Sequence, residues 1–220
     1  SQGSYGNFGS ISMGDDGTGG AVDVTISGGR VQGGSGAGAG VKIEAGTTAK
    51  LVNQGRLSAL SGLALDVRGN SALVENEGLI TGNATLGGAT STLFDNKAGG
   101  IFNSGETINL AAGSTVGELR NTGTVSPGGT GTIQTTALTG NYVQSAGGTL
   151  AVDADWPTSA SDKLAITGTA KLAGKVVVNP MNLLGAGANS GQAKTFTILT
   201  ATGGVTNNGI TVVDTPVLDF

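Results

Sequence analysis

Three carboxylates that lie close together in the sequence are the first candidates for chemistry. Asp153, Asp155 and Asp162 lie on either side of Trp156 and Pro157. A pair of carboxylates beside an aromatic side chain is typical of glycoside hydrolases, which need one acid and one base or nucleophile. The segment around the first two aspartates indicates a loop, however, and the third opens a regular alternation of apolar residues. We therefore expect these carboxylates to be structural rather than catalytic.

Two glycine-rich segments resemble binding motifs. The run Gly34-Ser35-Gly36-Ala37-Gly38-Ala39 mimics a dinucleotide fingerprint, but strand-like Val41-Lys42-Ile43 follows it where that motif requires a helix. The run Asp15-Asp16-Gly17-Thr18-Gly19-Gly20, with Asp23, is one poor copy of a repeated calcium-loop pattern. A solvated turn explains it better, so we predict no cofactor and no metal site.

The residue types that are missing exclude many reactions. The 220 residues include no cysteine and no histidine, which removes disulfides, thiolate zinc sites, cysteine nucleophiles and the usual general base. The net charge is −4 and no basic stripe is present, which argues against binding to nucleic acid. No apolar run reaches the roughly 20 residues that span a bilayer. We predict a protein that is not an enzyme, does not bind nucleic acid and does not itself insert into a membrane.

The 42 glycines indicate the fold class. A glycine inside a helix costs about 1 kcal/mol relative to alanine, and the glycines are spread along the whole chain. They follow no three-residue period, which excludes collagen. With 37% hydrophobic residues the chain has enough apolar side chains to fold, so its composition predicts an all-β protein.

Four segments share the pattern hydrophobic, Asn, Gly, hydrophobic. Their asparagines are Asn53, Asn76, Asn96 and Asn121, at separations of 23, 20 and 25 residues. Short β-prone stretches at such a drifting period are typical of the coils of a β-solenoid, here with about 22 residues per coil over residues 20–140. Asparagines at equivalent corners are then expected to form a ladder of side-chain amides. The alternative is a β-sandwich in which Asn-x-Gly is an ordinary turn.

A strict alternation of apolar residues begins at Asp162. Even positions are predicted to face a core and odd positions to face solvent. The apolar members of the inward row are Leu164, Ile166, Ala170, Leu172, Val176 and Val178. Gly168 and Gly174 interrupt this row and are expected at corners between consecutive strands. A further strand of the same type is predicted over residues 195–199.

Three motifs follow one another in the C-terminal half of the chain. They are Asn121-Thr122-Gly123-Thr124-Val125-Ser126-Pro127-Gly128-Gly129, Gly140-Asn141-Tyr142-Val143-Gln144, and Asp162-Lys163-Leu164-Ala165-Ile166-Thr167-Gly168-Thr169-Ala170. In this order they resemble the membrane-proximal end of a pertactin-like autotransporter passenger. The candidate motif and folding residues are Asn121, Gly123, Pro127, Gly128, Tyr142, Gly148, Leu150, Asp162, Leu164, Ile166, Gly168, Leu172, Gly174 and Phe196.

The resemblance implies a right-handed parallel β-helix, with coils over residues 1–140 and a C-terminal cap or autochaperone region over residues 141–220. It implies the structural stem and folding nucleus of an adhesin-like or virulence-related passenger, on or secreted from the surface of a Gram-negative bacterium. The implied partners are the chain's own translocator β-barrel in the outer membrane, and a host-surface or matrix ligand or self-association. The alternative function is that of a carbohydrate-active β-helix, either a polysaccharide lyase or a polysaccharide-binding module.

Overall fold

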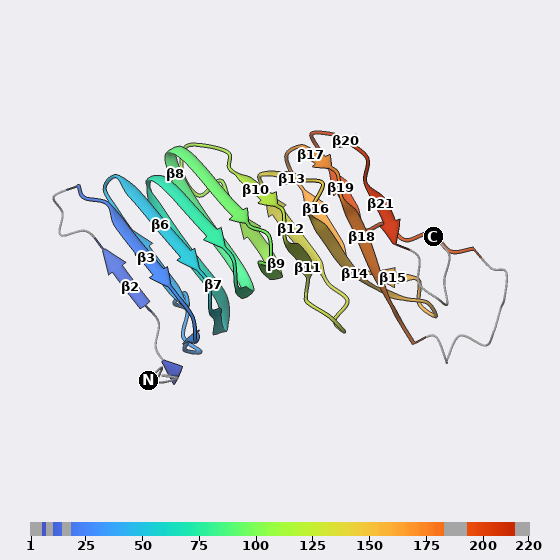
Figure 1. Cartoon of the computed structure of the whole chain (residues 1–220), viewed down its shortest axis with the longest axis horizontal. Helices are drawn as coiled ribbons and strands as arrows, with labels where there is room; N and C mark the ends of the chain where they lie inside the picture. Colours follow the sequence, from blue (N-terminus) through green and yellow to red (C-terminus); the bar gives the residue numbers. More distant parts are fainter. Residues whose placement is uncertain (1–5, 8–10, 15–18, 183–192, 214–220) are drawn as a thin grey trace.

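The chain is a parallel β-solenoid (Figure 1). The structure is a computed structural model, and it describes residues 6–7, 11–14, 19–182 and 193–213. Successive coils lie side by side along the long axis, and strands pair in parallel with the equivalent strand of the next coil. The predicted all-β parallel fold is confirmed. The sandwich alternative is wrong because its sheets would be antiparallel.

Each coil contributes strands to three faces, which the pairing defines. The first face contains β1 (Gly6–Asn7), β4 (Arg30–Gly33), β11 (Thr124–Pro127), β14 (Thr149–Asp155), β18 (Lys175–Met181) and β21 (Thr211–Val213). The second contains β2 (Ile11–Gly14), β5 (Val41–Glu44), β12 (Thr135–Thr139), β16 (Lys163–Ile166) and β19 (Leu199–Ala201). The third contains β3 (Val22–Ile26), β6 (Thr48–Asn53), β10 (Glu118–Asn121), β13 (Asn141–Gln144), β17 (Ala170–Leu172) and β20 (Val205–Asn207). Three strands bend from one face to the next, β7 (Arg56–Asn76), β8 (Leu79–Asn96) and β9 (Ile101–Asn109), and β15 (Ala160–Ser161) forms a hairpin with β14.

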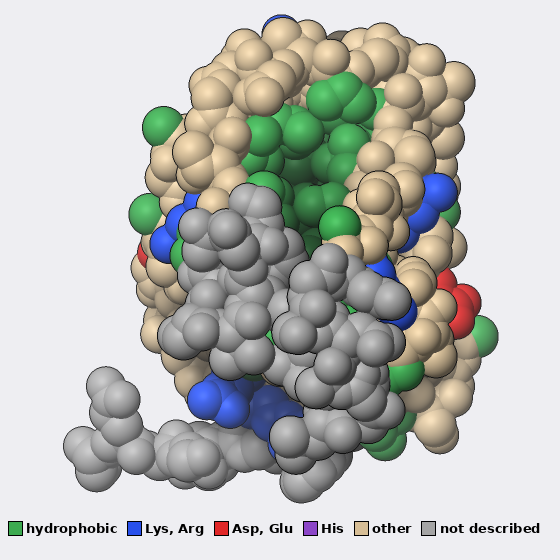
Figure 2. Space-filling model, turned by 90° about the vertical axis from the view of Figure 1, so that its right-hand side faces the viewer, with side chains coloured by type: hydrophobic (Ala, Val, Ile, Leu, Met, Phe, Trp, Pro, Cys, Tyr) green, Lys and Arg blue, Asp and Glu red, His purple; other side chains and the backbone are tan. Residues whose placement is uncertain are grey.

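The core is a set of side-chain columns that run along the solenoid axis. Because the coils stack in register, each inward residue lies on the inward residue of the coil before it. One column consists of Leu57, Ile80, Phe102, Val125, Leu150 and Val176. All six are buried, and full burial of one such side chain stabilises the fold by about 1.5–3 kcal/mol. Figure 2 shows the apolar side chains gathered inside a ring of backbone.

The corners between faces need glycine because adjacent coils approach closely there. A side chain at Gly123 would collide with the carbonyl oxygen of Gly100 in the preceding coil. Gly174 has a φ of +73°, in the left-handed region that glycine adopts without strain. The glycine-rich composition thus follows from the stacking distance of the coils.

The alternation predicted after Asp162 is confirmed. Leu164, Ile166 and Leu172 are buried, whereas Lys171 and Lys175 are exposed. Gly168 lies between β16 and β17, and Gly174 lies between β17 and β18, as expected for corners.

The strand predicted over residues 195–199 is wrong in its position. β19 comprises Leu199–Ala201 and pairs with β16, where Leu164 lies opposite Leu199. Two residues before Leu164, Asp162 is hydrogen bonded to Asp153 of β14 and to Gln134, and not to the segment that precedes β19. The residues before Ile198 therefore have no strand to pair with, despite their alternating pattern.

The parallel pairing crosses residue 140 without interruption. β10 pairs with β13, and β11 pairs with β14. The coils become longer toward the C-terminus, since Tyr142 pairs with Ala170 and Ala170 with Val205. The functional division into residues 1–140 and 141–220 stays a prediction. In the described part of the chain, there is no helix of the length and hydropathy needed to cross a membrane.

Candidate functional site

A ladder of buried asparagines runs through the corner between the third face and the first. The asparagine ladder consists of Asn53, Asn76, Asn96 and Asn121, all fully buried. The Nδ2 of Asn53 donates to Oδ1 of Asn76 at 2.8 Å, Asn76 donates to Asn96 at 2.8 Å, and Asn96 donates to Asn121 at 2.9 Å. The predicted amide ladder is confirmed.

Each ladder amide also holds the corner of its neighbouring coil. The second donor of Asn76 reaches the carbonyl oxygen of Ile101 at 3.1 Å, and that of Asn96 reaches Thr124 at 3.0 Å. A buried amide without partners would cost about 1–3 kcal/mol, and among the described residues no buried side-chain nitrogen or oxygen lacks one. The ladder therefore fixes the register of the stack without an energetic penalty.

The ladder ends in a polar cluster around Tyr142. Asn121 donates to the Tyr142 hydroxyl at 3.2 Å and to Gln144 Oε1 at 3.3 Å, while Tyr142 donates to the same Gln144 oxygen at 2.7 Å. Gln144 Nε2 continues to the carbonyl oxygens of Ala173 and Lys175. Burial raises the pKa of Tyr142 well above its ordinary value, and the hydrogen bond from Asn121 opposes only part of that effect. The phenol therefore stays neutral and donates its hydrogen bond to Gln144 of the same strand, β13.

A second buried polar cluster is centred on the aspartate pair, Asp153 and Asp162. Asp162 Oδ2 accepts a hydrogen bond from the backbone nitrogen of Asp153 at 2.8 Å, and its Oδ1 accepts one from Gln134 at 2.7 Å. Asp153 Oδ2 accepts from the backbone nitrogens of Gly131 and Thr132, at 2.5 and 2.9 Å. The aspartate pair thus ties the loop before β12 to the coil that follows it.

The loop predicted around the first two aspartates is wrong. Asp153 and Asp155 lie on β14, which extends to Asp155 and pairs with β18 as far as Met181. The strand continues because Asp153 has its charge satisfied by backbone donors and by Asn179 Nδ2 at 2.6 Å. Asp155, by contrast, accepts hydrogen bonds from Thr158 and Asn182, which lower its pKa.

These carboxylates do not form the arrangement that glycoside hydrolysis requires. Asp153 and Asp162 are 2% and 0% exposed, and each oxygen of both carboxylates accepts a hydrogen bond within the protein. Burial raises the pKa of Asp162 to about 6, although the backbone donors at Asp153 and Gln134 oppose the shift. The oxygens of both carboxylates are therefore occupied by contacts within the protein.

The β14–β15 hairpin lies directly beside the aspartate pair. Ala154 pairs with Ser161 and Asp155 with Ala160, in antiparallel register. The backbone nitrogen of Asp162 donates to the Asp153 carbonyl at 2.9 Å. Among the described strands, this pairing joins the residues that lie closest together in the sequence. The other pairings join strands of different coils.

The remaining candidate residues occupy strands and corners of the same region. Pro127 ends β11 opposite Ser104, and Gly128, with φ +72°, donates its backbone N–H to the Ser104 carbonyl. A side chain at Gly148 would lie 2.5 Å from the Asn121 carbonyl oxygen. Leu150 is buried in β14. Phe196 is half-buried, with its ring centroid 5.9 Å from that of Trp156.

Charged side chains form a network on the outer side of the third face. Lys50 lies 2.8 Å from Glu75, and Lys97 contacts both Glu75 and Asp95, at 3.3 and 2.7 Å. The hydrogen bond from Lys50, with that from Lys97, lowers the pKa of Glu75 against the effect of burial. The network joins the coils of β6, β7 and β8 from outside.

The two glycine-rich motifs have different outcomes. Residues 34–39 lie between β4 and β5, so that a strand follows the run, as predicted. Residues 15–18 of the calcium-like run lie outside the described residues, and Asp23 is an exposed residue of β3. No cluster of three or more aspartate or glutamate side chains suited to a metal ion occurs within the described ranges.

For two residues of these clusters, Gln144 and Asp153, the sequence analysis did not predict the buried contacts that the structure shows. Gln144 lies 23 residues after Asn121, accepts a hydrogen bond from it and precedes a glycine corner. The spacing of the repeat could therefore have predicted that Gln144 is buried at the end of the asparagine ladder. Asp153 gave no such signal, because its partners are backbone nitrogens of a loop in another coil and the side chain of Asn179.

Comparisons of the chain with protein-family models, with curated proteins and with solved structures found no match.

Proposed function

We propose that this chain is the structural stem and folding nucleus of an autotransporter passenger. In this proposal it stands on, or is released from, the surface of a Gram-negative bacterium, and its own translocator barrel is its partner. The proposal rests on the order of the three sequence motifs and on what their residues do in the fold. Asn121 and Tyr142 end the asparagine ladder, and Asp162 belongs to the aspartate pair.

The β14–β15 hairpin is the observation that supports a nucleus most directly. Parallel coils pay the entropy of closing a loop of one full coil before any pairing is gained, whereas a hairpin closes a short loop. The hairpin and the aspartate pair therefore form with the smallest entropic cost. Once β14 is fixed, its two edges offer templates to β11 and β18.

The stem role follows from the continuity of the stack. Each coil of a solenoid contacts only its neighbours, so stability grows by adding coils onto a formed end. The asparagine ladder and the apolar columns repeat the same contacts from coil to coil. Such a stack extends without requiring an energy source at the cell surface.

The experiment compares refolding rates of two matched leucine variants of the full chain. Leu164 in β16 and Leu51 in β6 are both fully buried, and each change to alanine costs about 2–5 kcal/mol. A residue of the nucleus slows folding when truncated, whereas a residue that packs later mainly accelerates unfolding. We expect Leu164→Ala to slow refolding and Leu51→Ala to accelerate unfolding, both measured by stopped-flow fluorescence. The reverse assignment of the two effects contradicts the proposal.

A further inference from the structure

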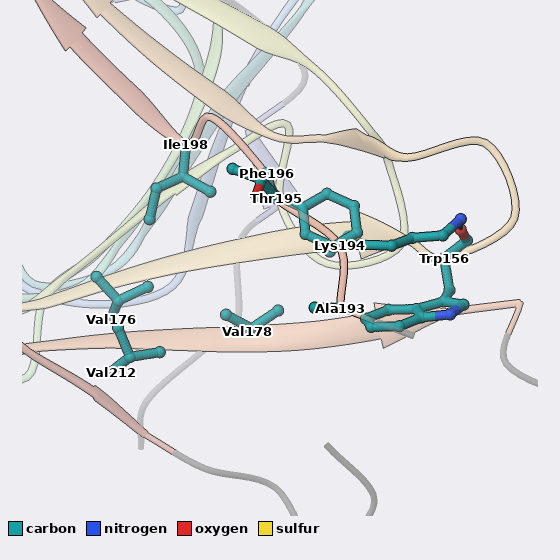
Figure 3. A pocket seen from close by; sticks show the side chains of 10 residues that line it. Trp156, Val176, Val178, Ala193, Lys194, Thr195, Phe196, Ile198 and Val212 are labelled. Carbon is teal, nitrogen blue, oxygen red and sulfur yellow. Dashed lines mark hydrogen bonds between the residues drawn. The ribbon is translucent and has the colours of Figure 1, made fainter. Parts of the chain in front are cut away.

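An apolar pocket of about 400 Å³ opens between β14, β18, β21 and the segment that leads into β19. Figure 3 shows its lining, in which aliphatic side chains form the base and two aromatic rings lie beside it. The residues used below are Trp156, Val176, Val178, Lys194, Phe196 and Ile198. Small-molecule sites typically have this size and this mixture of many apolar groups with few polar ones.

The inner wall of the pocket belongs to the rigid stack. Val176 and Val178 are inward-facing residues of β18 and are buried, and β18 pairs with β14 along seven residues. The wall offers aliphatic surface but no polar side chain. A ligand that covers it must be apolar along most of its length.

A single cation lies among the lining residues. Lys194 Nζ is 5.7 Å from the centroid of the Trp156 ring and donates hydrogen bonds to the carbonyl oxygens of Trp156 and Pro157. An ammonium group has three donors, so one remains for a ligand. The lining includes no aspartate or glutamate.

No carboxylate of the described residues neutralises this lysine through an ion pair. The ion pairs of the described chain involve other cations. Asp155, on the same hairpin as Trp156, has its oxygens bonded to Thr158 and Asn182, which lower its pKa, and the charge of Lys194 adds to that effect without forming an ion pair. The ammonium group of Lys194 therefore lies beside an apolar cavity and forms no ion pair with a described carboxylate.

We propose that this pocket binds an amphipathic anion, a single medium-length alkyl chain with a carboxylate head. The chain lies against Val176, Val178 and Ile198, between them and the ring of Phe196. The carboxylate accepts the third N–H of Lys194 at the mouth.

Decanoate is the probe, and the single tryptophan of the chain, Trp156, reports its binding. We expect decanoate, below its micelle-forming concentration, to change the Trp156 emission in a saturable way. Decyltrimethylammonium, which has a chain of the same length and the opposite charge, is expected to bind at least about tenfold more weakly. Equal affinities, or a change that does not saturate, overturn the proposal.

Variants then test the role of Lys194. Lys194→Gln is expected to weaken decanoate about tenfold and to leave the binding of uncharged decyl glucoside unchanged, while Lys194→Arg restores decanoate. The matched control is Lys175→Gln, since Lys175 is an exposed lysine of β18 outside the lining. A Lys194→Gln protein that binds decanoate as tightly as the Lys175→Gln protein contradicts the assignment. The ligand series on the unchanged chain decides the question if a variant fails to fold.

Discussion

The coils of the asparagine ladder and the segment around the β14–β15 hairpin are held together by different kinds of buried polar contact. In the ladder coils, one contact repeats: Asn53 binds Asn76 as Asn76 binds Asn96. Around the hairpin, the polar contacts do not repeat, and Asp153 and Asp162 accept hydrogen bonds from different backbone donors. A repeated contact suits a stem of any length but gives no preferred starting point. A unique, local cluster gives a starting point but cannot be extended.

The largest expected effect comes from placing a charge in the core of each region. Leu164→Asp and Leu51→Asp each remove a fully buried leucine, which costs about 2–5 kcal/mol before the charge is desolvated. We expect Leu164→Asp, and likewise Ile166→Asp, to abolish the cooperative unfolding transition. Leu51→Asp is expected to unfold the coils around β6 and to leave the later coils folded. Circular dichroism with limited proteolysis measures both.

The matched control for these variants is Ala165→Asp, on the outward side of β16. Its melting curve is expected to follow that of the unchanged chain. An unchanged melting curve for Leu164→Asp shows that the inward row is not the core.

Removing one rung of the ladder is the next largest change. Asn96→Ala removes the oxygen that accepts from Asn76 Nδ2 and the amide that donates to Asn121 Oδ1. The hydrogen bond from Asn53 to Asn76 Oδ1 stays in place. One N–H of Asn76 and the Oδ1 of Asn121 each lose a partner, which together costs about 2–6 kcal/mol. Asn208→Ala, at an exposed asparagine, is the control. Urea unfolding that gives both variants the same stability argues that the ladder does not fix the coils.

The repeating features of the fold were predictable from the sequence, and the unique ones were not. The positions of Asn53, Asn76, Asn96 and Asn121 predicted both the solenoid and the amide ladder, because stacking in register brings equivalent residues together. The alternation after Asp162 predicted the buried row. These signals are local patterns that each coil repeats.

The misses have a common physical cause. The strand predicted over residues 195–199 alternates correctly, yet strand formation depends on a partner, and β16 begins only at Lys163. The sequence around Asp153 and Asp155 indicates a loop, and aspartate is generally depleted in strands. Backbone donors at Gly131 and Thr132 stabilise the charge of Asp153, and no pattern near this residue indicates them.

A smaller effect is expected from pH, and it distinguishes the hairpin region from the ladder. The folded pKa of Asp162, about 6, exceeds the 3.8 of an ordinary aspartate. The stabilisation of the folded state by protonated Asp162 is therefore fully present below pH 3.8 and is lost as the pH rises through about 6. We expect the free energy of unfolding to be about 1 kcal/mol higher at pH 5 than at pH 7.5.

Asp162→Asn is expected to remove this pH dependence, and Asp23→Asn, at an exposed aspartate, to keep it. Glu75 does not interfere, because its lowered pKa makes its contribution disappear only as the pH falls below 4.5. A free energy of unfolding that is lower at pH 5 than at pH 7.5 contradicts the assignment. Denaturant titrations at the two pH values provide the measurement.

The smallest expected effect concerns the outer network of the ladder coils. Glu75→Gln removes the partner of Lys50 and one of the two partners of Lys97, which keeps Asp95, and surface pairs of this kind contribute about 0.2–1 kcal/mol. The loss is expected to vanish at high salt, which screens such charges. Thermal melts at low and high salt compare it with Glu106→Gln, at an exposed glutamate. A loss that persists at high salt indicates a packing effect instead.

Pulse-labelling hydrogen exchange during refolding of the full chain tests the central claim most directly. It records which backbone amides become protected first. If folding starts at the hairpin, the amides of β14, β16 and β18 gain protection before those of β3 and β6. Protection that appears first in β3 and β6, or simultaneously in all coils, contradicts a nucleus at the hairpin.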